Sequence, residues 1–499
     1  MPNHDVIVVG GGPGGSTSAT LLAKTGARVL LVDRKRFPRY QIGESLLPAT
    51  VHGVCALLGV SEDIHAAGFV RKRGGTFRWG ASPTPWTFDF GNSPVNQSLE
   101  FNYAYQVERA KFDEILLRNA QRNGVEVREG VAVVGALQEE GRVIGVELTD
   151  DSGGRSTAHA RFVVDASGNQ SRLHRYAGER VYSSFFQNVA LFGYFEDAGR
   201  LPEPNEGNIF SCTFPYGWFW YIPLSPTLTS VGAVISKQHA DRLRAGPERA
   251  MAEMIAACPE IRDLLATARR VDHGIYGRYR VRKDYSYTSS RFWAPGLVLV
   301  GDAACFVDPV FSSGVHLATY SGMLAARTIA TILSGDMEED VGSALYEERY
   351  RSEFSVFFDF LISFYDMHKD EDSYFWRARK ILGGAGPADD AFLQLVAGAG
   401  TTVPEFLRLR ERSGDLFQLR VESTVDPGKR PALFEALLKE LDVSQVHLRA
   451  VSRQVSVASP DGLDRELEFH RAGDPAARLG YRASDDGLHW EPVAGSTSP

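Results

Sequence analysis

The sequence predicts an α/β fold whose core is a parallel sheet flanked by helices. Residues 5–9 form a short apolar run that passes directly into the glycine-rich segment 10–15, and residues 16–25 have the composition of a small-residue helix. Two later apolar runs, at 162–168 and 297–304, also end in turns of small residues. Continuous apolar runs of this length are typical of strands that are buried on both faces of a parallel sheet.

The glycine-rich segment carries the pattern of a dinucleotide-binding loop. Gly10, Gly12 and Gly15 match G-x-G-x-x-G, and Pro13 lies inside the loop. The first glycine permits a tight turn, the second lets a pyrophosphate approach the backbone, and the third lets helix and strand pack closely. The following helix presents its N-terminal N–H groups to phosphate. Asp33 ends the next predicted strand, 23 residues after Gly10, where its carboxylate can accept hydrogen bonds from ribose hydroxyls.

The later motifs indicate FAD rather than NAD. The turn after residues 162–165 is typical of the adenosine side of flavoprotein sites. Asp302 resembles the carboxylate that holds the ribityl and pyrophosphate region in glutathione-reductase-like and hydroxylase-like flavoproteins, and Arg109 resembles an arginine that reaches the cofactor in the same group. Alternatively, Arg109 pairs with Asp113, four residues later on a helix. The resemblance spans two thirds of the chain and implies a glutathione-reductase-like, FAD-binding Rossmann domain.

Length and composition limit the class of protein. A chain of 499 residues is too long for one core and predicts two or three domains. The net charge of −8 argues against binding to nucleic acid, which requires a basic surface. We expect a cytoplasmic protein with no membrane partner, because we find neither a signal peptide nor an apolar stretch of roughly 18 residues. The four cysteines are widely spaced and lack C-x-x-C pairing, so we expect neither a disulfide framework nor a metal site.

The motifs divide the chain into two parts. Residues 1–330 are expected to form the FAD-binding module, with an inserted substrate sheet (about 70–100 and 176–284) that covers the flavin. Residues 331–499 are expected to form a smaller C-terminal region without a chemical motif. Its predicted parts are an aromatic helix over 346–368 with one wide apolar face, a break at 383–387, a short helix over 431–441 and small strands within 445–491.

Residues 218–223 are the most informative segment and read W-x-W-x-I-P. In a strand of the substrate sheet, Trp218, Trp220 and Ile222 would lie on one face. The hexapeptide also resembles the signature of flavin-dependent halogenases.

The loop that follows Asp33 extends this resemblance. Residues 37–39 and 43–48 resemble the segment that follows the ribose-binding acid in the halogenase family. The resemblance implies that Glu44 and Ser45 contact the cofactor.

Residues 308–314 resemble the flavin and halide loop of the same family, which implies that Pro309 and Gly314 border the flavin. The loop leads into a predicted apolar helix, and backbone N–H groups of Ser313 and Gly314 at such an entry would form a concave anion site for the halide. Alternatively, Ser312 merely caps the helix, and the helix dipole faces the flavin.

Lys72 is the candidate catalytic residue. It lies in the basic run 71–73, which by itself indicates a solvated edge strand. Alternation along a strand, however, places Lys72 on the face opposite Arg71 and Arg73. Lys72 and Gly74 match the K-x-G pattern in which halogenases carry their essential lysine, so the resemblance implies the same role here.

The resemblance implies a two-component enzyme. A separate flavin reductase would supply FADH2, which together with oxygen and halide yields hypohalous acid. Lys72 would hydrogen-bond this acid or become a haloamine, and an electron-rich aromatic ring would then take the halogen. Trp218 and Trp220 would wall off the flavin, so that its oxygen is not transferred directly to the substrate. Chloride is the expected halide because it is more available than bromide.

Phe311 narrows the expected substrate. Tryptophan halogenases carry a glutamate at this place in the loop, where it helps to stabilise the charged ring intermediate. A phenol or a pyrrole can stabilise that cation through its own oxygen or nitrogen. The resemblance therefore implies a phenolic polyketide or a pyrrole in natural-product biosynthesis, either free or tethered to an acyl carrier protein.

Three other functions share parts of these motifs. An FAD-dependent aromatic monooxygenase would share the flavin frame but would not need Lys72 or the tryptophan pair. A prenyl reductase or epoxidase would suit the aromatic residues of 346–365, but we find no membrane-associating segment. A non-catalytic, carrier-binding flavoprotein would not require the residues at 72 and 313.

Overall fold

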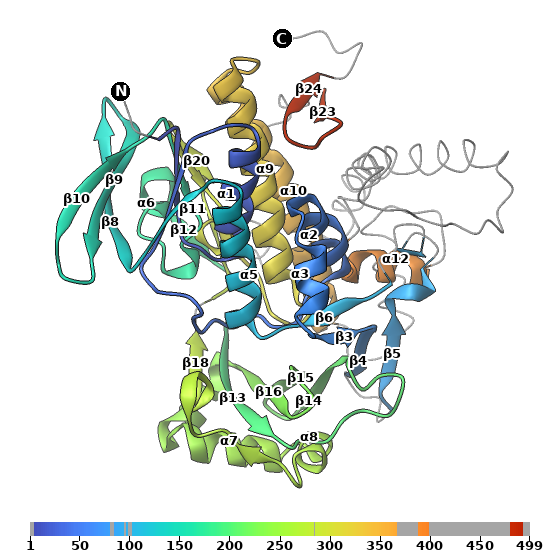
Figure 1. Ribbon diagram of the computed structural model, residues 1–499. Coiled ribbons are helices and arrows are strands. Elements are labelled where there is room, and N and C mark those ends of the chain that lie inside the picture. The colour runs from blue at the N-terminus through green and yellow to red at the C-terminus, as the bar shows by residue number, and fades with distance from the viewer. Residues whose placement is uncertain are drawn as a thin grey trace, which may run out of the picture.

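Two large sheets form the framework of the computed structural model, which describes residues 4–79, 84–93, 96–97, 102–283, 285–366, 388–398 and 480–492. One sheet has six strands and the other has eight. Figure 1 shows the six-stranded sheet among helices α1, α5, α9 and α10, and the eight-stranded sheet below it, with α7 and α8 on its lower side.

The six-stranded sheet has the order β20-β21-β11-β1-β2-β7, and only β20 runs antiparallel to its neighbour. Its strands are β1 (Val6–Val9), β2 (Val29–Asp33), β7 (Glu126–Glu129), β11 (Phe162–Asp165), β20 (Trp293–Ala294) and β21 (Leu297–Leu299). Every residue of β1, β2, β11 and β21 is buried. The strands predicted from the apolar runs are thereby confirmed, and they build a Rossmann-type α/β core.

Glycine spacing determines how the first helices pack on this sheet. Gly10 has a φ of +102°, and a Cβ atom on Gly15 would lie only 1.9 Å from the carbonyl oxygen of Gly10. A Cβ atom on Gly322 of α9 would lie 2.5 Å from the carbonyl oxygen of Gly14 in α1, so the two helices cross in close backbone contact. The helices around the sheet are α1 (Pro13–Lys24), α2 (Cys55–Leu58), α3 (Ser61–Ala66), α5 (Arg109–Arg122), α6 (His174–Ala177), α9 (Ser313–Ser334) and α10 (Glu339–Asp366).

The eight-stranded sheet has the order β17-β13-β16-β15-β14-β4-β5, with β18 also paired to β13. Its strands are β4 (Gly74–Arg78), β5 (Trp86–Asp89), β13 (Asn188–Glu196), β14 (Ile209–Phe214), β15 (Gly217–Pro223), β16 (Leu228–Ser236), β17 (Arg269–Arg270) and β18 (Arg280–Lys283). Trp218, Trp220 and Ile222 of β15 lie in the main core, as alternation predicts, whereas Phe219 and Tyr221 belong to a second core beneath the sheet. Helices α7 (Pro247–Ala256) and α8 (Pro259–Leu264) cover that second core.

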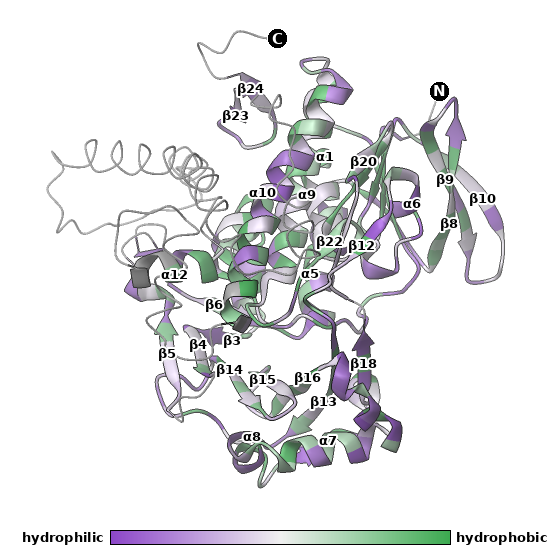
Figure 2. Ribbon diagram, turned by 180° about the vertical axis from the view of Figure 1, so that it is seen from behind, coloured by the Kyte–Doolittle hydropathy of each residue, from purple (hydrophilic) through white to green (hydrophobic). Residues whose placement is uncertain are grey.

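Smaller sheets complete the described fold. They are β8 (Val131–Glu139), β9 (Arg142–Asp150) and β10 (Arg155–His159) in one sheet, β12 (Arg180–Tyr182), β19 (Tyr287–Ser289) and β22 (Cys305–Phe306) in another, and the pair β3 (Val70–Lys72) and β6 (Ala104–Gln106). Figure 2 shows that β18 is hydrophilic.

Only part of the C-terminal region lies within the described residues. The predicted aromatic helix is present as α10, which starts earlier than expected and buries aromatic side chains along its length. Helix α12 (Ala388–Val396) follows, and β23 (Tyr481–Ala483) and β24 (Trp490–Pro492) form a hairpin. The predicted break at 383–387, the helix over 431–441 and the strands before residue 480 lie outside the described residues. Among the described helices, none combines the length and the apolar character needed to cross a membrane.

Candidate active site

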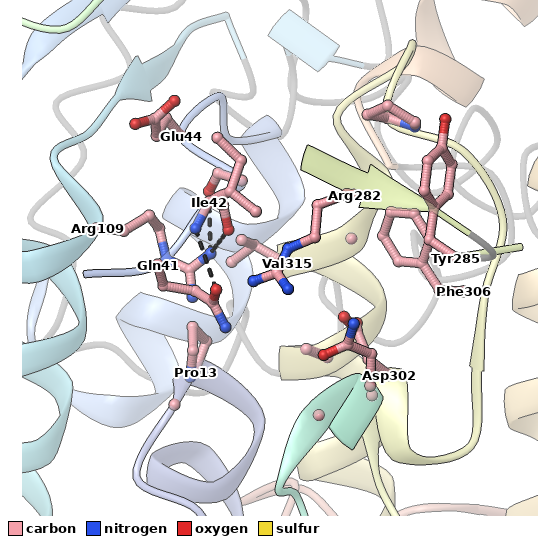
Figure 3. Close-up of a pocket in the computed structure, with 18 of the residues that line it drawn as sticks. Pro13, Gln41, Ile42, Glu44, Arg109, Arg282, Tyr285, Asp302, Phe306 and Val315 are labelled. Atoms are coloured by element: carbon pink, nitrogen blue, oxygen red, sulfur yellow. Dashed lines mark hydrogen bonds between the residues drawn. The ribbon is translucent and has the colours of Figure 1, made fainter. Parts of the chain in front are cut away.

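A cavity of about 570 Å³ is bordered by the glycine loop after β1 and by strands β13 and β15. This volume is within the range of cofactor pockets. The residues predicted from the sequence that line it are Gly10, Gly12, Pro13, Asp33, Glu44, Ser45, Arg109, Trp220, Asp302, Pro309 and Gly314. Figure 3 shows Arg109, Gln41 and Ile42 on one side of the cavity, and Arg282, Asp302 and Tyr285 on the other. Four predicted residues do not line it: Gly15, Lys72, Trp218 and Ser313.

The glycine loop leaves space for a ligand at Gly12. A Cβ atom there would meet only the Nη2 atom of Arg39, at 3.4 Å. The first N–H groups of α1 have no acceptor within the helix and begin at this point. Asp33 braces the loop, since its Oδ2 atom accepts a hydrogen bond of 2.7 Å from the backbone N–H of Gly11.

Two buried polar atoms beside the cavity lack a protein partner. The Oε1 atom of Glu44 accepts a hydrogen bond of 2.7 Å from the Tyr194 hydroxyl, but its Oε2 atom has no partner. The Ser45 hydroxyl also has none. Both residues line the cavity, so a ligand bound there could supply the missing partners. A polyhydroxylated ligand such as the ribityl chain of FAD would fit them. Burial raises the pKa of Glu44 to about 7.

Arg109 makes the helical ion pair that was the alternative to cofactor binding, and it also lines the cavity. Its Nε and Nη2 atoms donate to the two carboxylate oxygens of Asp113 at 2.7 and 2.9 Å. Its Nη1 atom donates to the backbone oxygens of Ile42 and Gly43 at 2.6 and 3.2 Å. Arg109 therefore holds the loop that carries Glu44. Across the cavity, burial raises the pKa of Asp302 to about 6.

The loop 308–314 reaches the cavity through Pro309, Ser312 and Gly314. Ser312 adopts a left-handed conformation with a φ of +61°, and its side chain makes no capping hydrogen bond. Ser312 thus occupies the position before α9 without the side-chain capping hydrogen bond that the alternative expected. Ser313, the first residue of α9, is fully buried and its hydroxyl has no partner.

The two tryptophans of β15 have different surroundings. Trp220 lines the cavity and donates from Nε1 to the Ser230 hydroxyl at 3.2 Å. Trp218 lies beyond it, with the two ring centroids 6.3 Å apart, and donates from Nε1 to the Tyr365 hydroxyl at 2.7 Å. Of the two tryptophans, therefore, Trp220 lines the cavity and Trp218 does not.

Lys72 is buried, whereas its neighbours Arg71 and Arg73 are exposed, as alternation predicts. Its Nζ atom donates a hydrogen bond of 3.0 Å to the backbone oxygen of Leu46 and lies 5.5 Å from the ring centre of Phe90. The ammonium group has no carboxylate partner among these contacts. Burial lowers the pKa of Lys72 from 10.5 to about 7.

An aromatic cluster connects Lys72 with the loop at the cavity. The ring of Phe90 contacts Phe88, Phe88 contacts Phe77, and Phe77 contacts Phe311 at a centroid distance of 5.9 Å. Phe311 also packs against rings from α10 and α12. Lys72 and the cavity therefore occupy two separate places joined by apolar packing.

Several residues that line the cavity belong to no sequence motif. Arg280, Val281 and Arg282 of β18 all line the cavity, and the side chain of Val281 is exposed. Alternation within residues 278–283 would have placed the apolar residues, not the arginines, on the inner face, so it gave no signal for Arg280 and Arg282. No local signal could have linked Tyr365 to Trp218, since 147 residues separate them.

The cysteines include one close pair that their spacing did not predict. The Sγ atoms of Cys212 and Cys258 lie 3.6 Å apart, and a carboxylate oxygen of Glu260 lies 3.8 Å from Cys258. The Arg78 guanidinium is 2.9 Å from Glu260, which places a positive charge beside this group. The pair lies in the second core beneath the sheet, away from the cavity.

The sequence of this chain is similar to those of known proteins. The family described as Tryptophan halogenase matches residues 5–101 and 94–413. A protein named Tryptophan 2-halogenase from Chondromyces crocatus is 39% identical over 406 residues, which cover 79% of this chain and 75% of that protein. The flavin-dependent halogenase armH3 of Armillaria mellea is 30% identical over 421 residues, which cover 77% of this chain and 81% of that protein.

Solved structures extend the similarity over nearly the whole chain. The myxobacterial chondrochloren halogenase CndH is 48% identical with a TM-score of 0.75, covering 98% of this chain and 99% of that chain. CmlS, a flavin-dependent halogenase, is 29% identical with a TM-score of 0.70, covering 98% of this chain and 84% of that chain. The chain therefore belongs to the flavin-dependent halogenases, and its cofactor is FAD.

Proposed function

We propose that this halogenase uses FADH2, oxygen and chloride to chlorinate a phenolic polyketide or a pyrrole, free or tethered to an acyl carrier protein. The observation that carries the proposal is the position of Lys72: a buried lysine that does not line the flavin cavity and that hydrogen-bonds the backbone oxygen of Leu46, next to the cavity residue Ser45. A lysine so placed can act on a small diffusing oxidant but cannot touch the flavin.

The cavity residues are proposed to hold FAD. Gly10 and Gly12 border the path of the pyrophosphate, and Asp33 lies where the ribose hydroxyls would donate. Glu44 and Ser45 offer unpaired polar atoms, and Asp302 stands opposite them. When bound and reduced, FAD supplies the electrons that activate oxygen, with which chloride is converted to hypochlorous acid.

The backbone N–H groups of Ser313 and Gly314 are proposed to hold the chloride ion. These two residues begin α9, so their N–H groups have no acceptor within the helix. Gly314 lines the cavity, and a Cβ atom there would meet the ring of Phe306 at 2.8 Å. A larger residue at this position would therefore displace the aromatic wall.

Lys72 is proposed to deliver the chlorine to the substrate. As an ammonium it donates a hydrogen bond to the oxygen of hypochlorous acid and so makes the chlorine more electrophilic. As a neutral amine it exchanges a proton for chlorine, releasing water, and the ring then takes the chlorine while a proton restores the amine. In both cases the Trp220 ring at the cavity wall keeps the substrate away from the flavin.

The proposed function is tested by one incubation with FAD, NADH, a flavin reductase, oxygen, chloride and a simple phenol. Mass spectrometry distinguishes addition of chlorine from addition of oxygen. We expect a chlorinated phenol, formed only when chloride is present. A hydroxylated product that does not depend on chloride would favour the monooxygenase.

The enzyme is expected to depend on a separate flavin reductase. In a preparation free of reductase, NADH or NADPH with FAD should give at most one turnover, and adding reductase or chemically reduced FAD should restore continuous chlorination. The measurement is product formed per enzyme molecule. Multiple turnovers without reductase would contradict the two-component proposal.

Phe311 is expected to mark a substrate that activates its own ring. Its side chain is buried among other aromatic rings, so no carboxylate stabilises a ring cation from this position. In a competition between free tryptophan and a panel of resorcinol-type and pyrrole acids, offered free and as carrier-protein thioesters, the panel should be chlorinated faster. The name of the Chondromyces crocatus relative refers to position 2, and carbon 2 of an indole belongs to its pyrrole ring. The position of any chlorine added to tryptophan is therefore measured as well. Efficient chlorination of the benzo ring, with no product from the panel, would overturn the proposal.

A further inference from the structure

Helix α10 contributes one hydroxyl group that hydrogen-bonds to the loop 308–314. Tyr365 lies near the end of α10, outside every sequence motif. Its hydroxyl accepts a hydrogen bond of 2.7 Å from Nε1 of Trp218 and donates one of 3.0 Å to Oδ1 of Asp308. One side chain therefore bridges the tryptophan strand and the first residue of the loop 308–314.

Asp308 shapes the loop from within. Its side chain is fully buried, and Oδ1 also accepts a hydrogen bond of 3.1 Å from the backbone N–H of Val310. Its Oδ2 atom lies 3.4 Å from Nδ2 of Asn188 on β13. The carboxylate thus holds the turn that leads to Ser312, and Tyr365 holds the carboxylate.

The loop needs such support because Ser312, the residue just before α9, has a strained backbone. Ser312 has a φ of +61°, a conformation that costs a residue with a Cβ atom free energy and persists when the surroundings enforce it. The N–H groups of Ser313 and Gly314 follow directly. If the backbone of Ser312 leaves the left-handed conformation, the N–H groups of Ser313 and Gly314 no longer point at the same place.

We propose that Tyr365 is a positioning residue that sets chloride affinity, by tying Trp218 to Asp308 and thereby keeping the N–H groups of Ser313 and Gly314 directed at one ion. This inference rests on the proposed chloride site. Tyr365 acts through other groups and touches no reactant. Through Tyr365, the region beyond residue 330 would help to position the proposed chloride site, although that region carries no sequence motif.

The test compares Tyr365→Phe with a matched control, Tyr346→Phe. Tyr346 lies on the same helix, is fully buried where Tyr365 is half-buried, and donates to the backbone oxygen of Leu299, away from the loop. Both variants lose one hydrogen-bonded hydroxyl. We expect the KM for chloride to rise about 5- to 150-fold in Tyr365→Phe, the range that follows from leaving a donor or acceptor unpaired. The kcat at saturating chloride and the FAD content should stay near wild type, and Tyr346→Phe should leave the KM for chloride unchanged.

Hydrogen exchange gives a second readout that does not depend on catalysis. Amides of residues 310–315 should exchange faster in Tyr365→Phe than in wild type and in Tyr346→Phe. An unchanged KM for chloride together with unchanged exchange would overturn the inference, as would loss of FAD, which would make Tyr365 structural. If the rate of the wild-type enzyme does not depend on chloride concentration, the proposed function is wrong. Faster exchange confined to the loop would then still show that Tyr365 positions it.

Discussion

Lys72→Ala is expected to lower chlorination by at least about 100-fold, the smallest effect usual for a positioned proton donor or acceptor, while FAD remains bound and is reduced and reoxidised as in wild type. The reason is position: Lys72 is buried outside the cavity, so its loss does not disturb the flavin. Arg73→Ala is the matched control, because this neighbouring side chain is basic but exposed on the opposite face. Product and oxygen consumption are measured together. Loss of bound FAD would make Lys72 structural, and preserved chlorination would remove it from the mechanism.

The pH dependence of chlorination should identify the form of Lys72 that acts. Burial lowers the pKa of Lys72 to about 7, so the ammonium predominates below that pH and the neutral amine above it. Activity that falls as pH rises through 7 indicates the ammonium, and activity that rises indicates the haloamine. The Arg73→Ala variant should retain the wild-type profile. A profile with no change near pH 7 would contradict both forms.

The same burial predicts that Lys72 destabilises the fold. The unfolded chain binds a proton with the ordinary pKa of 10.5, and the folded chain with a pKa of about 7, so the penalty is fully present below pH 7 and fades as pH rises to 10.5. A shift of this size corresponds to roughly 4–5 kcal/mol, offset in a variant by about 1–3 kcal/mol for leaving the Leu46 oxygen unpaired. Lys72→Met should therefore unfold at higher urea concentration than wild type at pH 7, with a smaller difference at pH 10. A less stable variant at pH 7 would contradict this expectation.

Gly12→Val is expected to weaken FAD binding by about 10- to 100-fold or more, since overpacking a tight site costs roughly 1–3 kcal/mol. A side chain at Gly12 meets little protein, because only Arg39 lies within 4 Å of its Cβ position, and so it would project into the cavity. The purified variant should be folded but colourless. Asp302→Ala should also lose FAD, through loss of a hydrogen-bond acceptor for the ribityl chain.

A comparison of Gly12→Val with Gly15→Val distinguishes loss of the cofactor from misfolding of the protein. A Cβ atom at Gly15 would lie 1.9 Å from the backbone oxygen of Gly10, so this variant should lose both FAD and thermal stability. Gly12→Val should retain the unfolding temperature of wild type freed of FAD. A normal yellow preparation from Gly12→Val and Asp302→Ala would contradict the assignment of FAD to these positions.

The sequence by itself determined the elements whose causes are local. Apolar runs and glycine spacing predicted β1, the phosphate loop and α1, because each depends on neighbours within a few residues. Alternation predicted that Lys72 lies opposite Arg71 and Arg73 and that the β15 tryptophans share one face, since side chains on successive strand residues point to opposite faces; in the structure these side chains are buried. Family resemblance then supplied the chemistry for those positions.

Only the tertiary structure decided how distant elements meet. Strand register and helix packing decided that Trp220 faces the cavity while Trp218 turns toward Tyr365, and that Arg109 both pairs with Asp113 and supports the neighbouring loop. The left-handed conformation of Ser312 likewise excluded the simple capping that its sequence position suggested. A contact between residues more than 100 positions apart depends on the angles and registers of all the elements between them, and no local pattern in the sequence encodes those.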